Sequence, residues 1–224
     1  ATFFLVTGYV GTDRLLWTEE VVVRILSSPG RAIPACASSA SVVVPSNILP
    51  RRELAVQMRE QAKMLSDTER VRYLAALRRE TNLDDALVDH ELNDFMNWDE
   101  ARSLAAMGFD IGSHTVEHRL LSRLSQDGLR TELVDSRRRL ETELQGAAFA
   151  IAFPNGGRDD YNDDVIRECE QAGYRLGFTV AERFQKAGGS PFLISRIGIA
   201  GHSDLGTFAL YASGLRDRLR RKSA

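Results

Sequence analysis

The sequence has almost no excess of charge of one sign, because its 29 lysine and arginine residues nearly balance its 31 aspartate and glutamate residues. Proteins that bind nucleic acid need a strong positive field, which the whole chain does not generate. The one basic cluster closes the chain, from Arg216 to Lys222, where it fits the solvated end of a helix. The sequence therefore predicts no nucleic-acid partner.

Long apolar runs and cysteines are also scarce. No run approaches the roughly 20 apolar residues that a membrane-spanning helix needs, so we expect no transmembrane segment. The two cysteines, Cys36 and Cys169, lie far apart and form no CxxC or Cys/His motif, which argues against a zinc knuckle or a disulfide scaffold. The cysteine spacing does not show whether these thiols are reduced. The oligomeric state also stays open.

The remaining composition is that of a folded globular protein, with 43% hydrophobic and 27% charged residues. The length predicts a single domain over residues 1–224. The chain opens directly on ATFFLVTGYV, the pattern of a strand buried on both faces. Because natural domains seldom begin inside their own core, we expect further residues upstream and a domain that is incomplete at its N-terminus.

The middle of the chain, at about residues 45–95, is predicted to be a helical insertion. Its amphipathic pattern suggests two or more helices, broken at Pro50 and at the turn formed by Ser66 and Asp67. His90 lies in this section, where a structural or exposed role fits it better than a catalytic one.

From Asn97 onward, predicted strands and helices alternate. A helix ends at Gly108, a long charged helix ends at Gly146, another ends at Gly173, and the last begins near Asp204. The strands between them are FDIGSH, AAFAIAFP, YRLGFTV and FLISRIGI. This alternation predicts βα units with parallel strands, in which functional residues gather at the carboxyl ends of the strands.

Two of the four histidines, His114 and His118, follow the predicted strand FDIGSH directly. If this segment is one helical turn, both rings face the same way and could bind one divalent ion. Gly112 and Ser113 would let the backbone turn tightly just before them. Surface or capping histidines are the alternative that the spacing by itself leaves open.

A second candidate is the loop after the strand AAFAIAFP. Pro154 fixes its own φ, and Gly156 and Gly157 permit close backbone approach. Such a loop could present a backbone N–H to an oxyanion. An ordinary turn is the alternative.

The stretches TFFLVTGYV, WDEARSLAAMGFDIGSHTVEH, FAIAFPNGG and AGYRLGFTV, in this order, resemble successive landmarks of the polysaccharide deacetylase family. These are metal-dependent carbohydrate esterases that remove N-acetyl groups from sugars. The resemblance implies an α/β fold, an irregular (β/α)7-type barrel, here lacking its first βα unit. It also implies a divalent metal cofactor, with Zn²⁺ as the first expectation.

The resemblance assigns roles to individual residues. His114 and His118 would be metal ligands, and the backbone N–H of Asn155 would stabilise the oxyanion. Substrate would be bound by Phe153, Pro154, Asn155, Gly156 and Arg196.

Two departures from the family pattern bear on catalysis. The family's Thr-Phe-Asp-Asp motif, which supplies the catalytic base and the third metal ligand, does not occur in the sequence and is expected upstream of Ala1. The family's late histidine, a general acid, has His202 as its candidate, although the surrounding pattern differs. In addition, Ala152 stands where the family often has an arginine.

The resemblance therefore implies a hydrolase of N-acetylated glycans or amino sugars that is inactive as this piece of chain. A non-catalytic carbohydrate-binding relative and a hydrolase of a cyclic amide or ureide on the same fold are the alternatives. The substrate class alone favours the cell envelope or the exterior.

Overall fold

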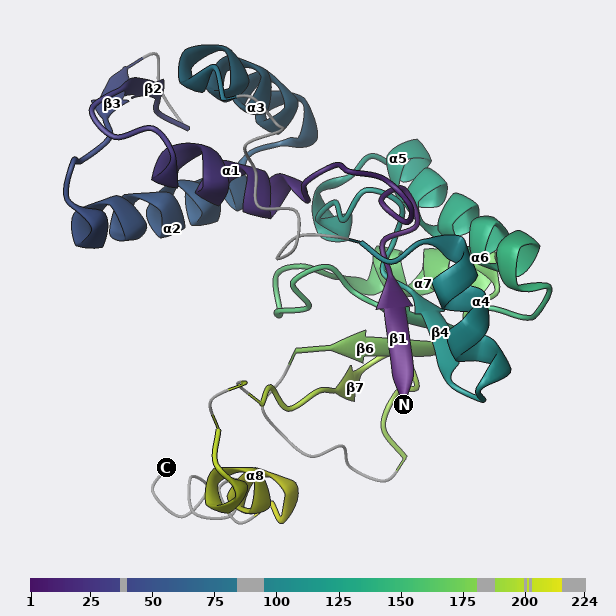
Figure 1. The fold of residues 1–224 in the computed structure, drawn as a ribbon. Helices are drawn as coiled ribbons and strands as arrows, with labels where there is room; N and C mark the ends of the chain where they lie inside the picture. The colour runs from purple at the N-terminus through teal and green to yellow at the C-terminus, as the bar shows by residue number, and fades with distance from the viewer. Residues whose placement is uncertain (37–39, 84–94, 181–187, 200, 202, 215–224) are drawn as a thin grey trace. The chain divides into compact units, whose positions relative to one another are not determined.

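The computed structural model describes residues 1–36, 40–83, 95–180, 188–199, 201 and 203–214 (Figure 1). The chain divides into two compact units. The first comprises Ala1–Thr7 with Ala101–Ala224, and the second comprises Gly8–Glu100. The section predicted as a helical insertion falls in the second unit, and whether it is an insertion into one domain stays a prediction.

The first unit is built on a parallel sheet with the strand order β1-β4-β5-β6-β7. These strands are β1 (Thr2–Leu5), β4 (Asp110–Ser113), β5 (Ala150–Ala152), β6 (Leu176–Thr179) and β7 (Ile194–Ser195). The predicted α/β class with parallel strands is confirmed. Within the described ranges the sheet is open, with β1 and β7 at its edges.

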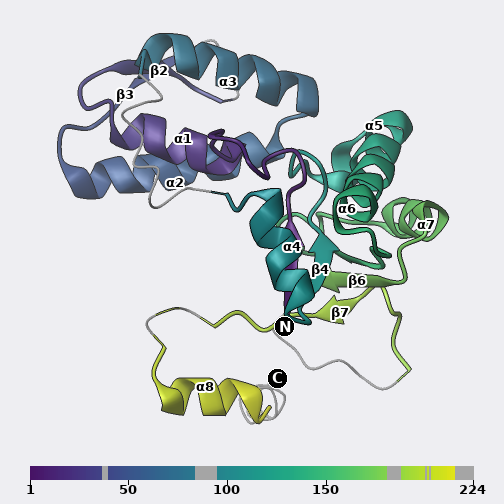
Figure 2. The ribbon, with the colours of Figure 1, turned by 45° about the vertical axis from the view of Figure 1, so that its right-hand side comes forward.

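One continuous helical segment follows β4 in the chain. It consists of α5 (Gln126–Arg130), a π-helical turn η4 (Thr131–Asp135) and α6 (Ser136–Leu144), and it lies beside α7 (Asp163–Ala172) in both ribbon views (Figures 1 and 2). Leu133, Ile151 and Phe153 are fully buried in the core that these helices share with the sheet. The short strand β5 is buried along its whole length, as expected for a central parallel strand.

Side-chain caps set the helix boundaries near those predicted. The Asn97 side chain accepts the N–H of Glu100, and the Glu100 carboxylate accepts the N–H of Asn97, at the start of α4 (Trp98–Ala106). Asn162 caps α7, which ends at Gly173 with φ of 90°. In the described residues of this unit, the 3-10 helix η3 (Leu121–Arg123) and α8 (Leu205–Ala212) are also helical.

The described part of the second unit packs helices with a two-stranded antiparallel hairpin. Its elements are α1 (Trp17–Leu26), β2 (Ala32–Pro34), β3 (Ser41–Val43), α2 (Ile48–Met64) and α3 (Asp67–Thr81). Val21, Ile25, Ile33 and Leu77 are fully buried in one core. The hairpin β2–β3 is an element that the sequence analysis did not predict.

The predicted helix break at Ser66 is confirmed, and the one at Pro50 is wrong. Ser66 forms a capping box with Glu69 at the start of α3. Pro50 instead lies in the first turn of α2, where backbone N–H groups have no intrahelical partner, so proline does not interrupt the helix.

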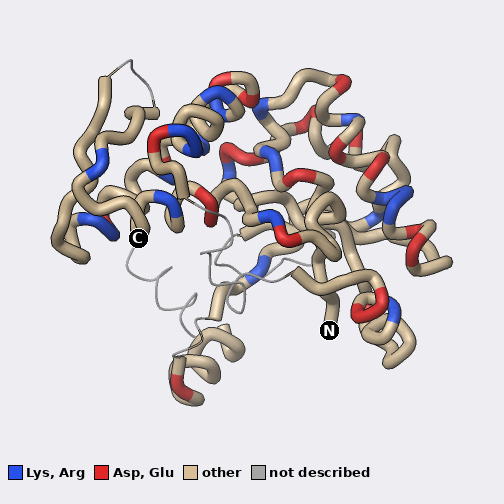
Figure 3. The backbone as a smooth tube through the Cα atoms, turned by 45° about the horizontal axis from the view of Figure 1, so that its top comes forward, with Lys and Arg blue, Asp and Glu red and all other residues tan. Residues whose placement is uncertain are grey.

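Basic and acidic residues are mixed along the helices of the described chain (Figure 3). None of the helices in the described residues combines the length and the hydropathy needed to cross a membrane.

Candidate functional site

His114 and His118 lie close together after β4, but not on a helical turn. Thr115 and His118 have φ of 72° and 53°, so the segment is a loop with two residues in the left-handed region. The two imidazole rings nevertheless lie with their centroids 4.7 Å apart and their planes at 78°. The loop, rather than helical spacing, brings the rings together.

Gly112 serves packing rather than turning, which corrects the sequence interpretation. It lies inside β4, in register with Phe4 of β1. A Cβ atom on Gly112 would lie 2.6 Å from Cε1 of Phe4. A side chain at position 112 would therefore force the Phe4 ring to move, and the tight turn begins only after Ser113.

The ring of His114 is held by the neighbouring strand. Its Nδ1 lies 2.7 Å from the carbonyl oxygen of Ala152 at the end of β5. Because a carbonyl oxygen only accepts hydrogen bonds, this contact places the proton on Nδ1 and leaves the lone pair on Nε2. This is the tautomer of a histidine that binds a metal through Nε2.

The electrostatic setting keeps His114 neutral near pH 7. Burial lowers the pKa of His114 to about 4; the Ala152 carbonyl acts against this shift and the positive charge of Arg196 adds to it. A neutral imidazole is the form that binds a metal. His118 is more than nine-tenths buried, with 8% of its surface exposed, and its backbone N–H donates to the Thr115 hydroxyl at 3.1 Å.

The loop after β5 has the backbone features that the sequence predicted. Asn155 and Gly156 have φ of 56° and 71°. The Gly156 N–H donates to the Pro154 carbonyl at 2.7 Å, and the Gly156 carbonyl accepts the Val180 N–H at 2.8 Å. Within the described residues, the Asn155 N–H donates to no protein atom, so it is available to a bound group.

The remaining predicted site residues differ in accessibility. Phe153 is fully buried and stacks on Tyr161, with ring centroids 5.2 Å apart, so its side chain supports the loop from the core. Arg196 follows β7, donates from Nε to the Thr179 carbonyl at 3.3 Å and lies over the Phe4 ring. His202 and His90 lie outside the described residues.

The donor types at the histidine pair fit a divalent ion such as Zn²⁺, since two imidazoles lie with their centroids 4.7 Å apart and one is fixed in the ligating tautomer. His114 and His118 together supply two protein ligands. In the described part of the chain, His, Cys, Asp and Glu form no cluster of three or more that could hold a metal ion.

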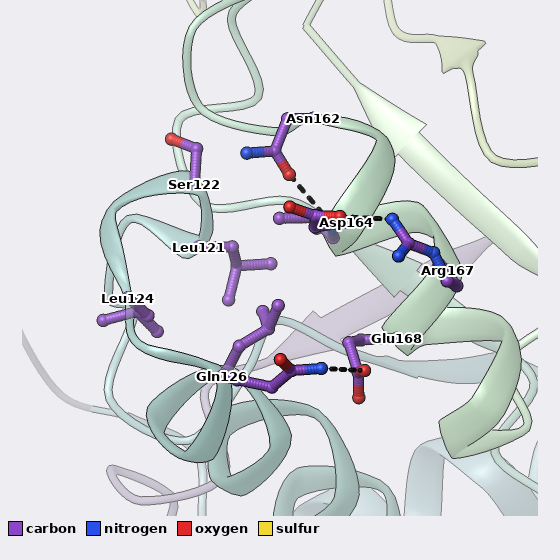
Figure 4. A pocket seen from close by; sticks show the side chains of 10 residues that line it. Leu121, Ser122, Leu124, Gln126, Asn162, Asp164, Arg167 and Glu168 are labelled. Atoms are coloured by element: carbon purple, nitrogen blue, oxygen red, sulfur yellow. Dashed lines mark hydrogen bonds and ion pairs between the residues drawn. The ribbon is translucent and has the colours of Figure 1, made fainter.

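A pocket of about 220 Å³ lies between η3, α5 and α7 (Figure 4). Its polar groups have protein partners: Gln126 donates to Glu168 at 3.0 Å, Asn162 caps α7, and Arg167 pairs with Asp164. None of the predicted site residues lines this pocket.

Sequence reasoning missed one residue beside the histidine pair. Glu132 is 1% exposed, and its carboxylate accepts the backbone N–H groups of Val116 and Glu117 at 2.8 and 3.0 Å. A signal was present in the helix pattern, because Glu132 stands three residues after Leu129 and four before Ser136, both buried. An acidic residue on a buried helix face needs partners.

Comparisons with known proteins agree with the resemblance read from the sequence. A family model described as polysaccharide deacetylase matches residues 73–177. The protein named "Putative polysaccharide deacetylase YxkH" of Bacillus subtilis (strain 168) is 21% identical over 118 residues, which are 53% of this chain and 41% of that protein.

Two solved structures of deacetylases are also similar. Streptococcus pyogenes deacetylase PplD, in complex with acetate, is 26% identical, with a TM-score of 0.49 over 53% of this chain and 51% of that chain. The polysaccharide deacetylase BC0361 of Bacillus cereus is 22% identical, with a TM-score of 0.46 over 55% of this chain and 39% of that chain. The chain thus spans about half or less of the length of these relatives. The resemblance to the polysaccharide deacetylases that the sequence predicted is confirmed, because residues 73–177 match the model of that family.

Proposed function

We propose that this chain is part of a metal-dependent hydrolase that removes N-acetyl groups from a polysaccharide or another N-acetylated sugar. The observation that carries the proposal is the adjacent imidazole pair at the end of β4, in which the Ala152 carbonyl selects the metal-binding tautomer of His114. The family match supports the substrate class.

In this proposal, His114 and His118 hold a divalent ion, with Zn²⁺ as the first candidate. A bound ion of this kind would act as a Lewis acid toward the acetamide carbonyl and would lower the pKa of water. Water is consumed in the reaction: its oxygen ends on the acetyl carbon and its protons on the products, as the C–N bond breaks to acetate and a free amino sugar.

The loop after β5 would stabilise the charge that develops on the acetamide oxygen. The Asn155 N–H lies on the loop that follows the strand whose carbonyl holds His114. The left-handed φ of Asn155 suits an oxyanion donor, and so does the absence of an acceptor for its N–H among the described residues. Pro154, Gly156 and Arg196 would line the substrate side, and His202 remains the predicted general acid.

Two measurements on the same protein test the proposal. Zn²⁺ binding is measured by isothermal titration calorimetry, and acetate release is measured with N-acetylglucosamine oligomers. We expect wild-type protein and His90→Ala to bind Zn²⁺ alike, and His114→Ala and His118→Ala to lose binding at least tenfold. Equal binding by all four proteins would place the metal elsewhere and overturn the metal assignment.

The assays with candidate substrates separate the proposed function from its two alternatives. Zn²⁺-dependent acetate release supports the proposal. Binding of the oligomers without acetate release would favour a carbohydrate-binding role, and turnover of small cyclic amides without acetate release would favour the cyclic amide or ureide reaction.

A further inference from the structure

One buried carboxylate joins the middle of the loop that carries the two histidines to the helical segment behind it. Glu132 Oε2 accepts the N–H of Val116 at 2.8 Å and that of Glu117 at 3.0 Å. These are two of the three residues between His114 and His118. One carboxylate oxygen therefore holds the middle of the loop whose two ends bear the candidate ligands.

The loop conformation needs such an attachment. Thr115 and His118 are non-glycine residues with φ of 72° and 53°, and side-chain-bearing residues seldom adopt this region unless their surroundings impose it. Inside the loop, the Thr115 hydroxyl accepts the His118 N–H. This local bond orients His118 relative to Thr115, but it does not connect the loop to the rest of the protein.

A second set of contacts holds the start of the loop. The Ser113 hydroxyl accepts the Thr115 N–H at 3.0 Å and lies 2.9 Å from the Ser136 hydroxyl. Ser136 in turn contacts the Tyr174 hydroxyl at 3.0 Å. The loop is thus attached twice to the same helical segment, at its start through Ser136 and at its middle through Glu132.

The helical segment departs from α-helical geometry at the residue that makes this contact. Glu132 lies in the π-helical turn Thr131–Asp135, and the Ser136 hydroxyl donates to the Glu132 carbonyl at 2.6 Å. Single π-helical turns inside α-helices are frequent at functional sites. Here the Glu132 side chain of such a turn contacts the histidine loop.

The cost of burying the carboxylate is offset by its partners. Burial raises the pKa of Glu132, while the N–H groups of Glu117 and Val116, the charge of Arg119, whose Nη1 lies 3.6 Å from Oε1, and the hydroxyl of Thr115 act against this rise. A buried acidic side chain with four such partners has its desolvation offset.

We propose that Glu132 is a positioning residue of the histidine pair: through the Val116 and Glu117 N–H groups, it holds the loop in the conformation that brings the imidazoles of His114 and His118 together. The inference rests on the proposed function for its consequence, which is metal affinity. The role is a positioning one because the Glu132 carboxylate acts on the backbone N–H groups of the loop.

The experiment compares Glu132→Gln with a matched control. Glutamine keeps the size of the side chain but replaces one acceptor oxygen by a donor amide. Glu168→Gln removes another buried carboxylate, 6% exposed, from α7 of the same unit, where it contacts Gln126 and Arg130 rather than the loop. A general loss of stability should affect both variants.

Two readouts are taken below the melting midpoints of all three proteins. The first is amide hydrogen exchange of Val116 and Glu117 in metal-free protein. The second is Zn²⁺ affinity by calorimetry, because partners behind metal ligands typically contribute about 10- to 100-fold to affinity. We expect Glu132→Gln to speed exchange of both amides at least tenfold and to weaken Zn²⁺ binding about 10- to 100-fold, and Glu168→Gln to match wild type.

A conservative replacement of Glu132 gives a third comparison. Glu132→Asp retains the charge and both acceptors on a shorter side chain, so it should recover part of the affinity that Glu132→Gln loses. Unchanged exchange, unchanged Zn²⁺ affinity in Glu132→Gln, or equal losses in Glu168→Gln would each overturn the proposal. If wild-type protein binds no Zn²⁺, the metal site fails, and the exchange readout alone decides whether Glu132 holds the loop.

Discussion

Nδ1 of His114 lies 2.7 Å from the carbonyl oxygen of Ala152, so the end of β5 fixes the ring at the end of β4. Side chains at neighbouring strand ends of a parallel sheet meet at one edge, and here a backbone carbonyl takes part as well. The contact requires no side chain at position 152, which is why an alanine suffices there.

This contact predicts the tautomer of His114. In metal-free protein at pH 7, the ring should be neutral and protonated on Nδ1, because the carbonyl accepts that proton and burial lowers the pKa of the ring to about 4. Two-bond ¹⁵N–¹H correlation spectra of the imidazole distinguish the two tautomers. A proton on Nε2 at pH 7 would contradict the assigned contact.

A second prediction concerns the packing of β1 on β4. Gly112→Ala should destabilise the protein by about 1–3 kcal/mol, because overpacking in a closely packed core has costs of this size. The new Cβ would lie 2.6 Å from Cε1 of Phe4 and 3.1 Å from the Ala150 carbonyl oxygen.

Urea denaturation of Gly112→Ala and Gly198→Ala measures the effect. Gly198 has no neighbour within 4 Å of its added Cβ, so its replacement should change the free energy of unfolding by less than about 0.5 kcal/mol. The packing role of Gly112 is refuted if the two variants unfold alike.

A third prediction separates steric contact from backbone strain in the loop after β5. Gly156 and Gly188 have φ of 71° and 77°, so alanine at either position should cost roughly 1 kcal/mol from the left-handed backbone. Only at Gly156 would the Cβ also meet backbone atoms, with the Val180 nitrogen at 2.9 Å.

Gly156→Ala should therefore destabilise the protein by about 1–3 kcal/mol more than Gly188→Ala, as expected for overpacking. Under the proposed function it should also reduce acetate release, because it displaces the Asn155 N–H. Denaturation midpoints and acetate assays of the two variants measure both effects, and equal destabilisation would show that the Val180 contact relaxes freely.

The ends of α4 and α7 were predictable from sequence because each is encoded locally. Asn97, Asn162 and Gly173 mark helix ends by chemistry that acts within a few residues. Pro50 misled the prediction, since its effect depends on whether it falls in the first turn or in the interior of the helix.

The histidine pair was predictable in its members but not in its geometry. HxxxH spacing suggested a helical turn, whereas the structure brings the rings together by left-handed backbone at Thr115 and His118. That conformation depends on Glu132, which follows His118 by 14 positions and contacts the loop only because the helical segment packs against it. Such long-range contacts leave little trace in a single sequence.

A fourth prediction concerns the acid stability of the second unit. Glu20 is buried in α1, and its carboxylate accepts Arg24 Nε at 2.7 Å and both Nε and Nη2 of Arg78 at 2.6 Å. Burial raises the pKa of Glu20, but the hydrogen bonds and charges of Arg78 and Arg24 lower it by more, so the net shift is downward. The bonds with Arg78 join α1 to α3.

Because the folded pKa of Glu20 lies below its unfolded value, the stabilisation is fully present above the unfolded pKa, near 4.3, and is lost as the pH falls through the folded pKa. Glu20→Gln should therefore lower the urea midpoint at pH 7 and make it less sensitive to pH below about 4.5 than in wild type. Glu19→Gln, which alters the exposed neighbour, should retain the wild-type pH dependence. If Glu20→Gln and wild type lose stability in parallel on acidification, the ion pairs of Glu20 do not contribute to acid sensitivity.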